Sequence, residues 1–218
     1  MVNGPPPIRE HRQWTPLARA LAATGDQWTL LIALELSSGA LRLSQLRSQL
    51  PGVSTGVLSR HLQHMVALGL LARRRFRELP PRVEYELTES GRELLPIVGA
   101  LARWGMARMW SAPQPREQVD VCVLLRLLPV LLEDVELPPG VVELAIEHTE
   151  QPANHLFNIV EGRLQPIALG STIPWVSISG SPGDWIAALG PARANSQLRM
   201  TGDEQLGNRI LEAFPRRA

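Results

Sequence analysis

A Pro51-Gly52 pair between two short amphipathic segments constrains the fold of this chain more than any other feature. Apolar residues recur every three or four positions on each side of the pair, which predicts two helices with one buried face each. These residues are Leu43, Leu46 and Leu50 before the pair and Leu58, Leu62, Met65 and Val66 after it. Proline and glycine end the first helix in a tight turn, and Ser54 can cap the second helix, which we expect to reach about Leu68. The pattern is that of a helix-turn-helix motif.

The second helix of this motif presents small and polar side chains opposite its apolar stripe. They are Ser54, Thr55, Gly56, Ser59, Arg60, Gln63 and His64. The DNA major groove is about 12 Å wide and admits one α-helix, and small residues at the start of a helix let its backbone approach phosphates. Arg60 and Gln63 can reach base edges, so we expect this face to bind double-stranded DNA. From periodicity alone, a capped helix that serves only packing is the alternative.

After Gly69 the hydrophobic period changes to that of strands. Residues 70–76 and 83–87 predict a hairpin with a rigid, basic tip at 77–82. Such a hairpin behind a helix-turn-helix is a wing, whose arginines would lie along the DNA backbone or the minor groove and add affinity but little sequence information. The hairpin arginines are Arg73, Arg74, Arg75, Arg77 and Arg82, and among them we expect Arg75, Arg77 and Arg82 to contact DNA. A solvated surface is the alternative for such a run.

Further helices flank the motif. Thr15-Pro16 begins a first helix that ends at Gly25-Asp26, and a very apolar helix follows at about 27–36. Thr88 caps a long last helix that ends before Pro113. The expected division is 1–13 for a flexible arm, 14–112 for a winged helix-turn-helix domain and 113–218 for a second domain.

Charge divides the chain in the same way. Residues 1–112 hold 14 arginines and 8 acidic residues, a formal charge of +6, whereas residues 113–218 hold 8 arginines and 13 acidic residues, a formal charge of −5. A basic half joined to an acidic half indicates that only the first half meets a polyanion.

Six segments of the first half share an order and spacing with a known family. They are Gly25–Ile32, Leu50–Ser54, Leu58–Leu62, Gly69–Leu71, Pro80–Thr88 and Trp104-Gly105. Through them, residues 15–110 resemble the HxlR family of bacterial winged-helix regulators, relatives of the MarR type. The resemblance implies that Thr55–His64 is the recognition helix and Arg77–Arg82 the wing tip. It also implies a homodimer, built from the first helix and the long last helix, that reads an inverted repeat with half-sites about one helical turn apart.

One departure from the family concerns cysteine. Many members carry a cysteine just before the first helix, where this chain has Thr15. Cys122 lies in an apolar segment, where we expect a buried, inert thiol. A thiol switch is therefore not expected.

The second half combines helices with strand-like runs. An apolar helix at 119–132 should end near Pro129 or shortly after it. The following elements are strands at 141–147, 155–160, 164–169 and 173–179, a short helix capped by Ser181, a strand at 197–200 and a helix at 203–214.

Three short segments of this half resemble sterol-carrier-protein-type domains: Phe157–Gly162, Trp175–Gly180 and Gly202-Asp203. The resemblance implies a small α+β domain with helices on an antiparallel sheet, often around an apolar tunnel. The residues expected to line a pocket for a small hydrophobic metabolite are Leu156, Phe157, Trp175, Ile178 and Trp185. Ordinary core positions are the alternative for each of them.

No residue set predicts catalysis, a metal site or a cofactor. The five histidines are scattered, the single cysteine excludes an internal disulfide, and no glycine-rich phosphate loop occurs. There is no run of about 18 apolar residues and no signal-like start, so we expect a cytoplasmic protein with no membrane partner.

The chain is thus expected to be an α+β protein that regulates transcription by acting as a repressor. A hydrophobic metabolite in the C-terminal domain, or in a cleft between domains, would change its DNA affinity. A lipid or hydrophobic-metabolite carrier whose winged helix mediates protein contacts is the second hypothesis, and an enzyme of unknown chemistry in the second half is the third. Steep salt dependence of DNA affinity would distinguish the regulator from the carrier.

Overall fold

The structure is a computed structural model that describes residues 14–77, 82–111, 114, 120–147, 153–190 and 197–214. Proximity of Cα atoms divides the chain into two compact units, Met1–Leu95 and Pro96–Ala218. This boundary falls inside the segment that the sequence assigns to the first domain, because residues 102–110 pack with the apolar core that follows them in the chain. The expected arm at 1–13 and the hairpin tip at 78–81 lie outside the described residues.

The helices of the first unit begin where the sequence supplies caps. Thr15, Ser54 and Thr88 each accept a hydrogen bond from a backbone amide of the first helical turn, which satisfies a donor that has no partner inside the helix. The helices are α1 (Pro16–Thr24), α2 (Thr29–Glu35), α3 (Leu43–Gln49), α4 (Thr55–Ala67) and α5 (Glu89–Arg92). α3 and α4 are joined through Pro51-Gly52, where Gly52 has a φ of 86°. The helix-turn-helix prediction is therefore confirmed.

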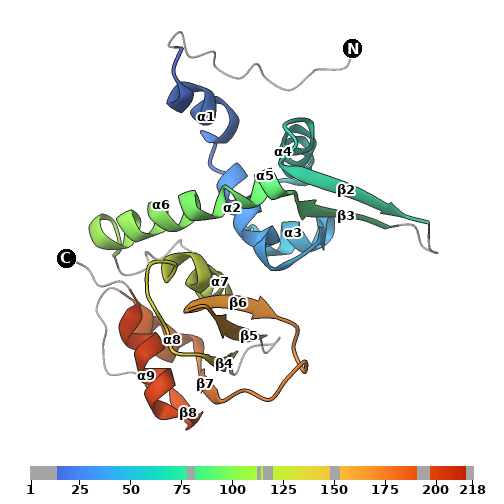
Figure 1. The fold of residues 1–218 in the computed structure, drawn as a ribbon. Coiled ribbons are helices and arrows are strands. Elements are labelled where there is room, and N and C mark those ends of the chain that lie inside the picture. Colours follow the sequence, from blue (N-terminus) through green and yellow to red (C-terminus); the bar gives the residue numbers. More distant parts are fainter. Residues whose placement is uncertain are drawn as a thin grey trace. The chain divides into compact units, whose positions relative to one another are not determined.

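A three-stranded antiparallel sheet completes this unit, in the order β1-β3-β2. Its strands are β1 (Leu41–Arg42), β2 (Leu71–Phe76) and β3 (Arg82–Leu87). β2 and β3 form the expected hairpin, which projects from the helices in Figure 1. The core of the unit joins the sheet to the helices and includes Ile32, Leu46, Leu58, Leu62, Met65 and Leu87.

The prediction of one long helix after Thr88 is wrong. α5 ends at Arg92, and a separate helix, α6, spans Leu95–Arg108. Pro96 explains the break, because proline has no N–H to donate to the carbonyl of Arg92 and its ring clashes with the preceding turn. In the first turn of a new helix that N–H would have no partner, so Pro96 is tolerated there.

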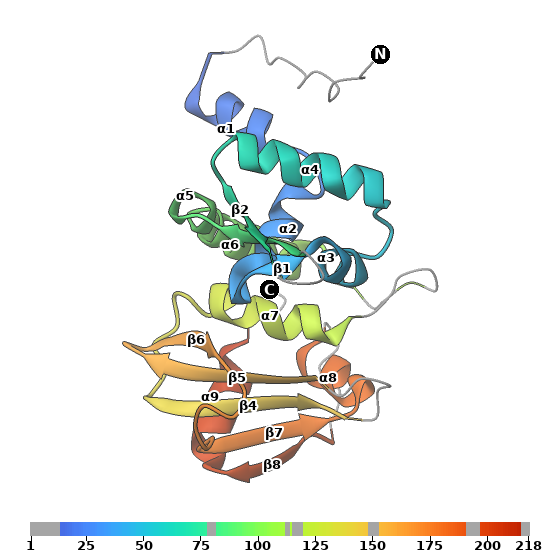
Figure 2. The ribbon, with the colours of Figure 1, turned by 90° about the vertical axis from the view of Figure 1, so that its right-hand side faces the viewer.

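The second unit is built on a five-stranded sheet in the order β6-β5-β4-β7-β8 (Figure 2). Its strands are β4 (Gly140–Ile146), β5 (Ala153–Val160), β6 (Arg163–Ile167), β7 (Val176–Gly180) and β8 (Arg199–Gly202). The prediction of an antiparallel sheet is wrong for one pair of strands, since β4 and β7 are parallel. The chain after β6 returns along the sheet through 168–175 and enters β7 in the direction of β4, which a tight hairpin could not achieve.

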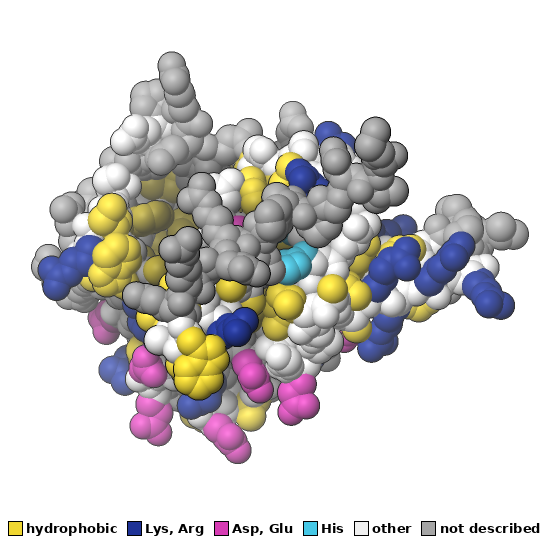
Figure 3. All heavy atoms as spheres, turned by 90° about the horizontal axis from the view of Figure 1, so that it is seen from above, with side chains coloured by type: hydrophobic (Ala, Val, Ile, Leu, Met, Phe, Trp, Pro, Cys, Tyr) yellow, Lys and Arg dark blue, Asp and Glu magenta, His cyan; other side chains and the backbone are white. Residues whose placement is uncertain are grey.

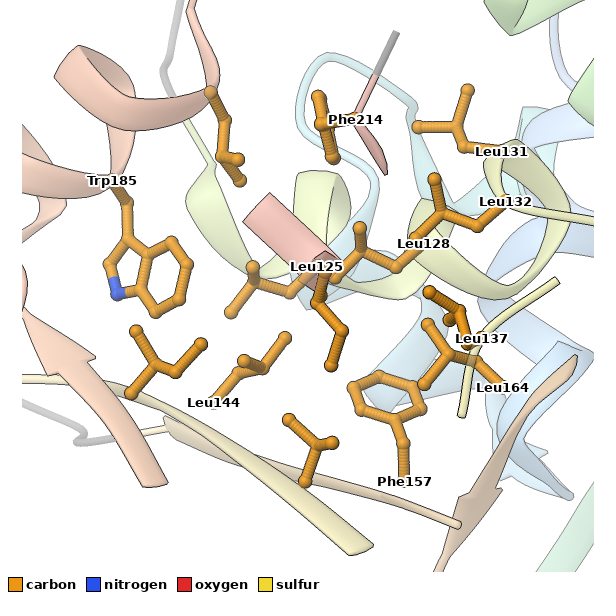
Figure 4. Close-up of a cluster of buried hydrophobic side chains, with 14 of the residues drawn as sticks. Leu125, Leu128, Leu131, Leu132, Leu137, Leu144, Phe157, Leu164, Trp185 and Phe214 are labelled. Atoms are coloured by element: carbon orange, nitrogen blue, oxygen red, sulfur yellow. The ribbon is translucent and has the colours of Figure 1, made fainter. Parts of the chain in front are cut away.

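Helices cover one face of this sheet. They are α7 (Val121–Leu131), α8 (Pro182–Leu189) and α9 (Glu204–Ala213). α7 is capped by Asp120 and continues two residues past Pro129. Figure 4 shows Leu125 and Leu128 of α7 converging with Phe157 and Trp185 in one buried apolar core. In the part of the chain that is described, no helix is long and apolar enough to cross a membrane.

Candidate nucleic-acid interface

α4 divides sharply into a buried and an outward face. Leu58, Leu62 and Met65 are fully buried. The residues expected to contact DNA lie on the other side: Ser54, Thr55, Gly56, Arg60 and Gln63 are exposed, and Ser59 and His64 are half-buried. The structure thus brings the seven expected contacts of this helix together on one surface.

Gly56 lies in the first turn of α4 with open space beside it. A Cβ at this position would meet no atom within 4 Å, and the position needs no positive φ. Packing therefore does not require a glycine here. An absent side chain would instead allow another molecule to approach the helix backbone closely.

The arginines of the hairpin lie on two different faces. Because side chains alternate along a strand, Arg73 and Arg75 share one face with their partners Tyr85 and Val83, whereas Arg74 lies on the opposite face. Arg73, Arg75 and Arg77 are exposed and form no ion pair with another described residue. Figure 3 shows blue arginine side chains lining the projecting hairpin.

The opposite face of the hairpin is neutralised by glutamates. Arg74 pairs with Glu86 across 2.8 Å, and Arg82 lies 3.3 Å from Glu84. The guanidinium of Arg82 also stacks over the Phe76 ring, 4.5 Å from its centroid. Arg75 and Arg77 thus remain available for phosphates, whereas Arg82, the third expected wing contact, is engaged within the hairpin.

A polar contact ties α4 to the segment before α2, and the sequence did not indicate it. Oδ1 of Asp26 lies 3.5 Å from Nδ1 of His61. Burial would raise the pKa of Asp26, but hydrogen bonds from the Thr29 hydroxyl and from the amides of Trp28 and Thr29 outweigh it, so the pKa lies below its ordinary value. An aspartate three residues before Thr29 is an N-cap signal, but its histidine partner is 35 positions away and no local pattern predicts it.

The five residues expected to line a ligand pocket do not lie together. Phe157, Ile178 and Trp185 are buried in the core of the second unit, and Trp185 Nε1 donates to the carbonyl of Ala145 at 3.0 Å. Leu156 points to the opposite face of the sheet because it is next to Phe157 in β5. Trp175 precedes β7 and is 55% exposed.

Two titratable side chains near the start of α7, His155 and Cys122, favour their neutral forms. Burial and the nearby Arg126 lower the pKa of His155 to about 4, against an opposing effect of Asp120. Burial, reinforced by Asp120, raises the pKa of Cys122, which favours the unreactive thiol expected there. Within the described residues, no cluster of three or more histidine, cysteine or acidic side chains is placed to hold a metal ion.

The first half of the chain is similar in sequence to known regulators. Residues 23–113 match the model of the HxlR-like helix-turn-helix family. An uncharacterized HTH-type transcriptional regulator from Methanothermobacter thermautotrophicus is 38% identical over 95 residues, which are 44% of this chain and 71% of that protein. YvaP, an uncharacterized HTH-type transcriptional regulator from Bacillus subtilis, is 35% identical over 95 residues, 44% of this chain and 86% of its own length. The solved structure of the redox regulator HypR in its reduced form is 32% identical, with a TM-score of 0.40, and the match covers 42% of this chain and 90% of that one. Through its first half, the chain belongs to the HxlR-like helix-turn-helix family of transcriptional regulators.

Proposed function

We propose that this regulator is a homodimeric, sequence-specific repressor that inserts α4 into the major groove and lays the β2–β3 hairpin along the DNA backbone. The outward face of α4 carries the proposal: Thr55, Gly56, Arg60 and Gln63 are exposed on a helix whose other face is fully buried. A helix with one buried face, small residues at its start and long polar side chains beyond them suits readout of base edges. Arg73, Arg75 and Arg77, which form no ion pair with another described residue, supply sequence-independent affinity.

Two exposed apolar rows support the homodimer. On α1 and just before it, Trp14, Leu17 and Leu21 are 87%, 68% and 45% exposed. On α6, Ile97, Leu101 and Trp104 recur at helical spacing and are each more than half exposed. Large apolar side chains that recur along a helix surface commonly mark an interface. A two-fold dimer through these helices would read an inverted repeat with half-sites about one helical turn apart.

The second unit is proposed as a sterol-carrier-like domain that makes DNA binding sensitive to a small hydrophobic metabolite. Support comes from its helix-covered sheet and from exposed apolar side chains in the connection before β7, namely Leu169, Ile173 and Trp175. Trp175 is the expected pocket residue that a ligand can reach. Phe157, Ile178 and Trp185 would have to move apart to line a cavity. In this proposal residues 14–112 form the DNA-binding domain and residues 113–218 the ligand-binding domain, with α6 serving the DNA-binding dimer.

Selection from a pool of duplexes with a randomised centre tests the proposal. The full-length protein should enrich one sequence with two-fold symmetry, and its affinity should fall steeply with salt, by about 0.9 in log–log slope per phosphate neutralised. No enrichment, together with no DNA binding at low salt, would overturn the proposal in favour of the carrier. Titration of the complex with a fluorescent long-chain fatty acid tests the ligand response: bound probe that leaves DNA affinity unchanged would refute it.

A further inference from the structure

Asp26 is a fixed acceptor at the start of α2. Its Oδ1 accepts hydrogen bonds from the amides of Trp28 (2.7 Å) and Thr29 (2.9 Å), and its Oδ2 accepts one from the Thr29 hydroxyl (2.5 Å). Three hydrogen bonds to the residues that open α2 leave this carboxylate little freedom. Because Ile32 and Ala33 of α2 are fully buried in the core, the carboxylate is anchored to the rigid part of the first unit.

His61 lies on α4 at the border between its two faces. It follows the exposed Arg60 and precedes the fully buried Leu62. Its Nδ1 faces Asp26 Oδ1 at 3.5 Å, and its side chain is 23% exposed. The contact therefore lies beside the outward face, within one residue of a proposed base contact.

The buried stripe of α4 does not by itself fix how the helix is rotated about its axis. Apolar contacts are non-directional, so a small roll costs little as long as the same area stays buried. A roll of about 10° nevertheless moves a side-chain tip about 6 Å from the axis by about 1 Å. That displacement is enough to spoil a bidentate hydrogen bond to a base.

We propose that Asp26 and His61 act as positioning residues that fix the roll of α4 and so aim Arg60 and Gln63 at the base edges. This inference rests on the proposed function, since it concerns how the same helix discriminates between DNA sequences. Neither residue contacts DNA in this scheme. Their contact acts on sequence discrimination and leaves the phosphate contacts of the wing unchanged.

The test compares affinity for the duplex enriched by the wild-type protein with affinity for a shuffled duplex. His61→Ala should lower this ratio about three- to fivefold, as expected for a partly exposed polar pair, with little change in affinity for the shuffled duplex. His61→Asn should restore most of the ratio, because its amide nitrogen occupies nearly the position of Nδ1. His61→Phe, which keeps a ring at this position but has no polar atom to face Asp26 Oδ1, gives the same readout if His61→Ala fails to fold.

The outcomes separate this inference from the proposed function. If the wild type enriches a sequence but His61→Ala and His61→Phe discriminate as well as the wild type, the positioning role is overturned and the regulator stands. An equal loss of affinity for both duplexes would also overturn it, because such a loss leaves the discrimination between the two sequences unchanged. If the wild type enriches no sequence, the proposed function itself fails.

Discussion

The guanidinium of Arg103 on α6 donates to the carbonyl oxygen of Val130 at the end of α7, with Nη1 and the oxygen 2.8 Å apart. Its Nη2 also lies 3.3 Å from the carboxylate of Asp134. Gly99, one turn earlier on α6, faces the same carbonyl so closely that a Cβ would lie 2.4 Å from it. α6 is therefore held against α7 by a close backbone approach and by an arginine that satisfies a carbonyl near the helix end, where partners within the helix are lacking.

Gly99→Ala should destabilise the second unit by about 1–2 kcal/mol. The added methyl clashes with the Val130 backbone, a cost that exceeds the gain of about 0.5–1 kcal/mol in helix propensity. Gly105→Ala is the matched control on the same helix, since a Cβ there meets no atom within 4 Å, and it should stabilise by the propensity term alone. Urea unfolding of both variants measures the difference. Equal stability of the two would contradict the close packing of α6 on α7.

Gly56→Ala should separate folding from DNA binding. Because the position is open, alanine should leave stability unchanged or raise it by up to about 1 kcal/mol. Affinity for enriched and shuffled duplexes should both fall, since the methyl group holds the start of α4 away from the phosphates. Thermal unfolding and gel-shift titration measure the two effects. Wild-type affinity in this variant would mean that DNA does not approach the helix backbone at Gly56.

Arg60→Ala and Gln63→Ala should each reduce discrimination between the enriched and shuffled duplexes by about 1–3 kcal/mol, the usual value of a good base contact. Both side chains are exposed on the outward face of α4, so their removal leaves the core intact. Affinity ratios from competition gel shifts provide the measurement. A uniform loss on all duplexes would reassign these residues to phosphate contacts.

Arg75→Ala should weaken binding to every sequence and reduce the salt slope by about 0.9, as expected for one lost phosphate contact. Arg74→Ala is the matched neighbour on the other face of β2, where Glu86 already pairs it. Its effect on the slope should be smaller. Fluorescence anisotropy over a salt series measures both slopes. A larger change for Arg74→Ala would mean that the face carrying Arg74, and not the face carrying Arg75, contacts the phosphates.

Local sequence patterns predicted the elements whose formation depends on residues close together in the chain. Apolar periodicity and Pro51-Gly52 were sufficient for α3 and α4, and the change of period after Gly69 was sufficient for the hairpin. Pro96 is a sequence signal for the break between α5 and α6, but the apolar spacing continues on both sides of it and predicts a single helix. Strand alternation also places Arg74 on the same face as Glu84 and Glu86, but the register puts Glu84 directly opposite it and does not select Glu86 as its partner.

Features that depend on distant residues could not be predicted in this way. The parallel pairing of β4 with β7 joins strands that are separated by two others in sequence. Trp175 and Trp185 look equivalent in the sequence, yet one is 55% exposed and the other fully buried, because tertiary packing decides which ring the helices cover. The contact between Asp26 and His61 likewise exists only after α2 and α4 have packed into one core.

His155 should make the second unit sensitive to acid. Burial and the nearby positive charge of Arg126 lower its pKa from 6.5 to about 4, although Asp120 opposes the shift. The unfolded chain therefore takes up the proton first as the pH falls. The stability associated with neutral His155 is fully present above pH 6.5 and is lost progressively as the pH drops toward 4.

Between pH 6.5 and 4 the unfolding free energy of the wild type should fall by up to about 3 kcal/mol more than that of His155→Gln. The difference should grow by about 1.4 kcal/mol for each pH unit. Glutamine keeps a polar side chain at the position but does not titrate. His64→Gln in the first unit is the matched control for the replacement of a histidine by glutamine. Urea unfolding between about pH 4 and 7, followed by near-ultraviolet circular dichroism, measures all three proteins. Parallel curves for wild type and His155→Gln would show that His155 is not the group whose protonation destabilises the fold.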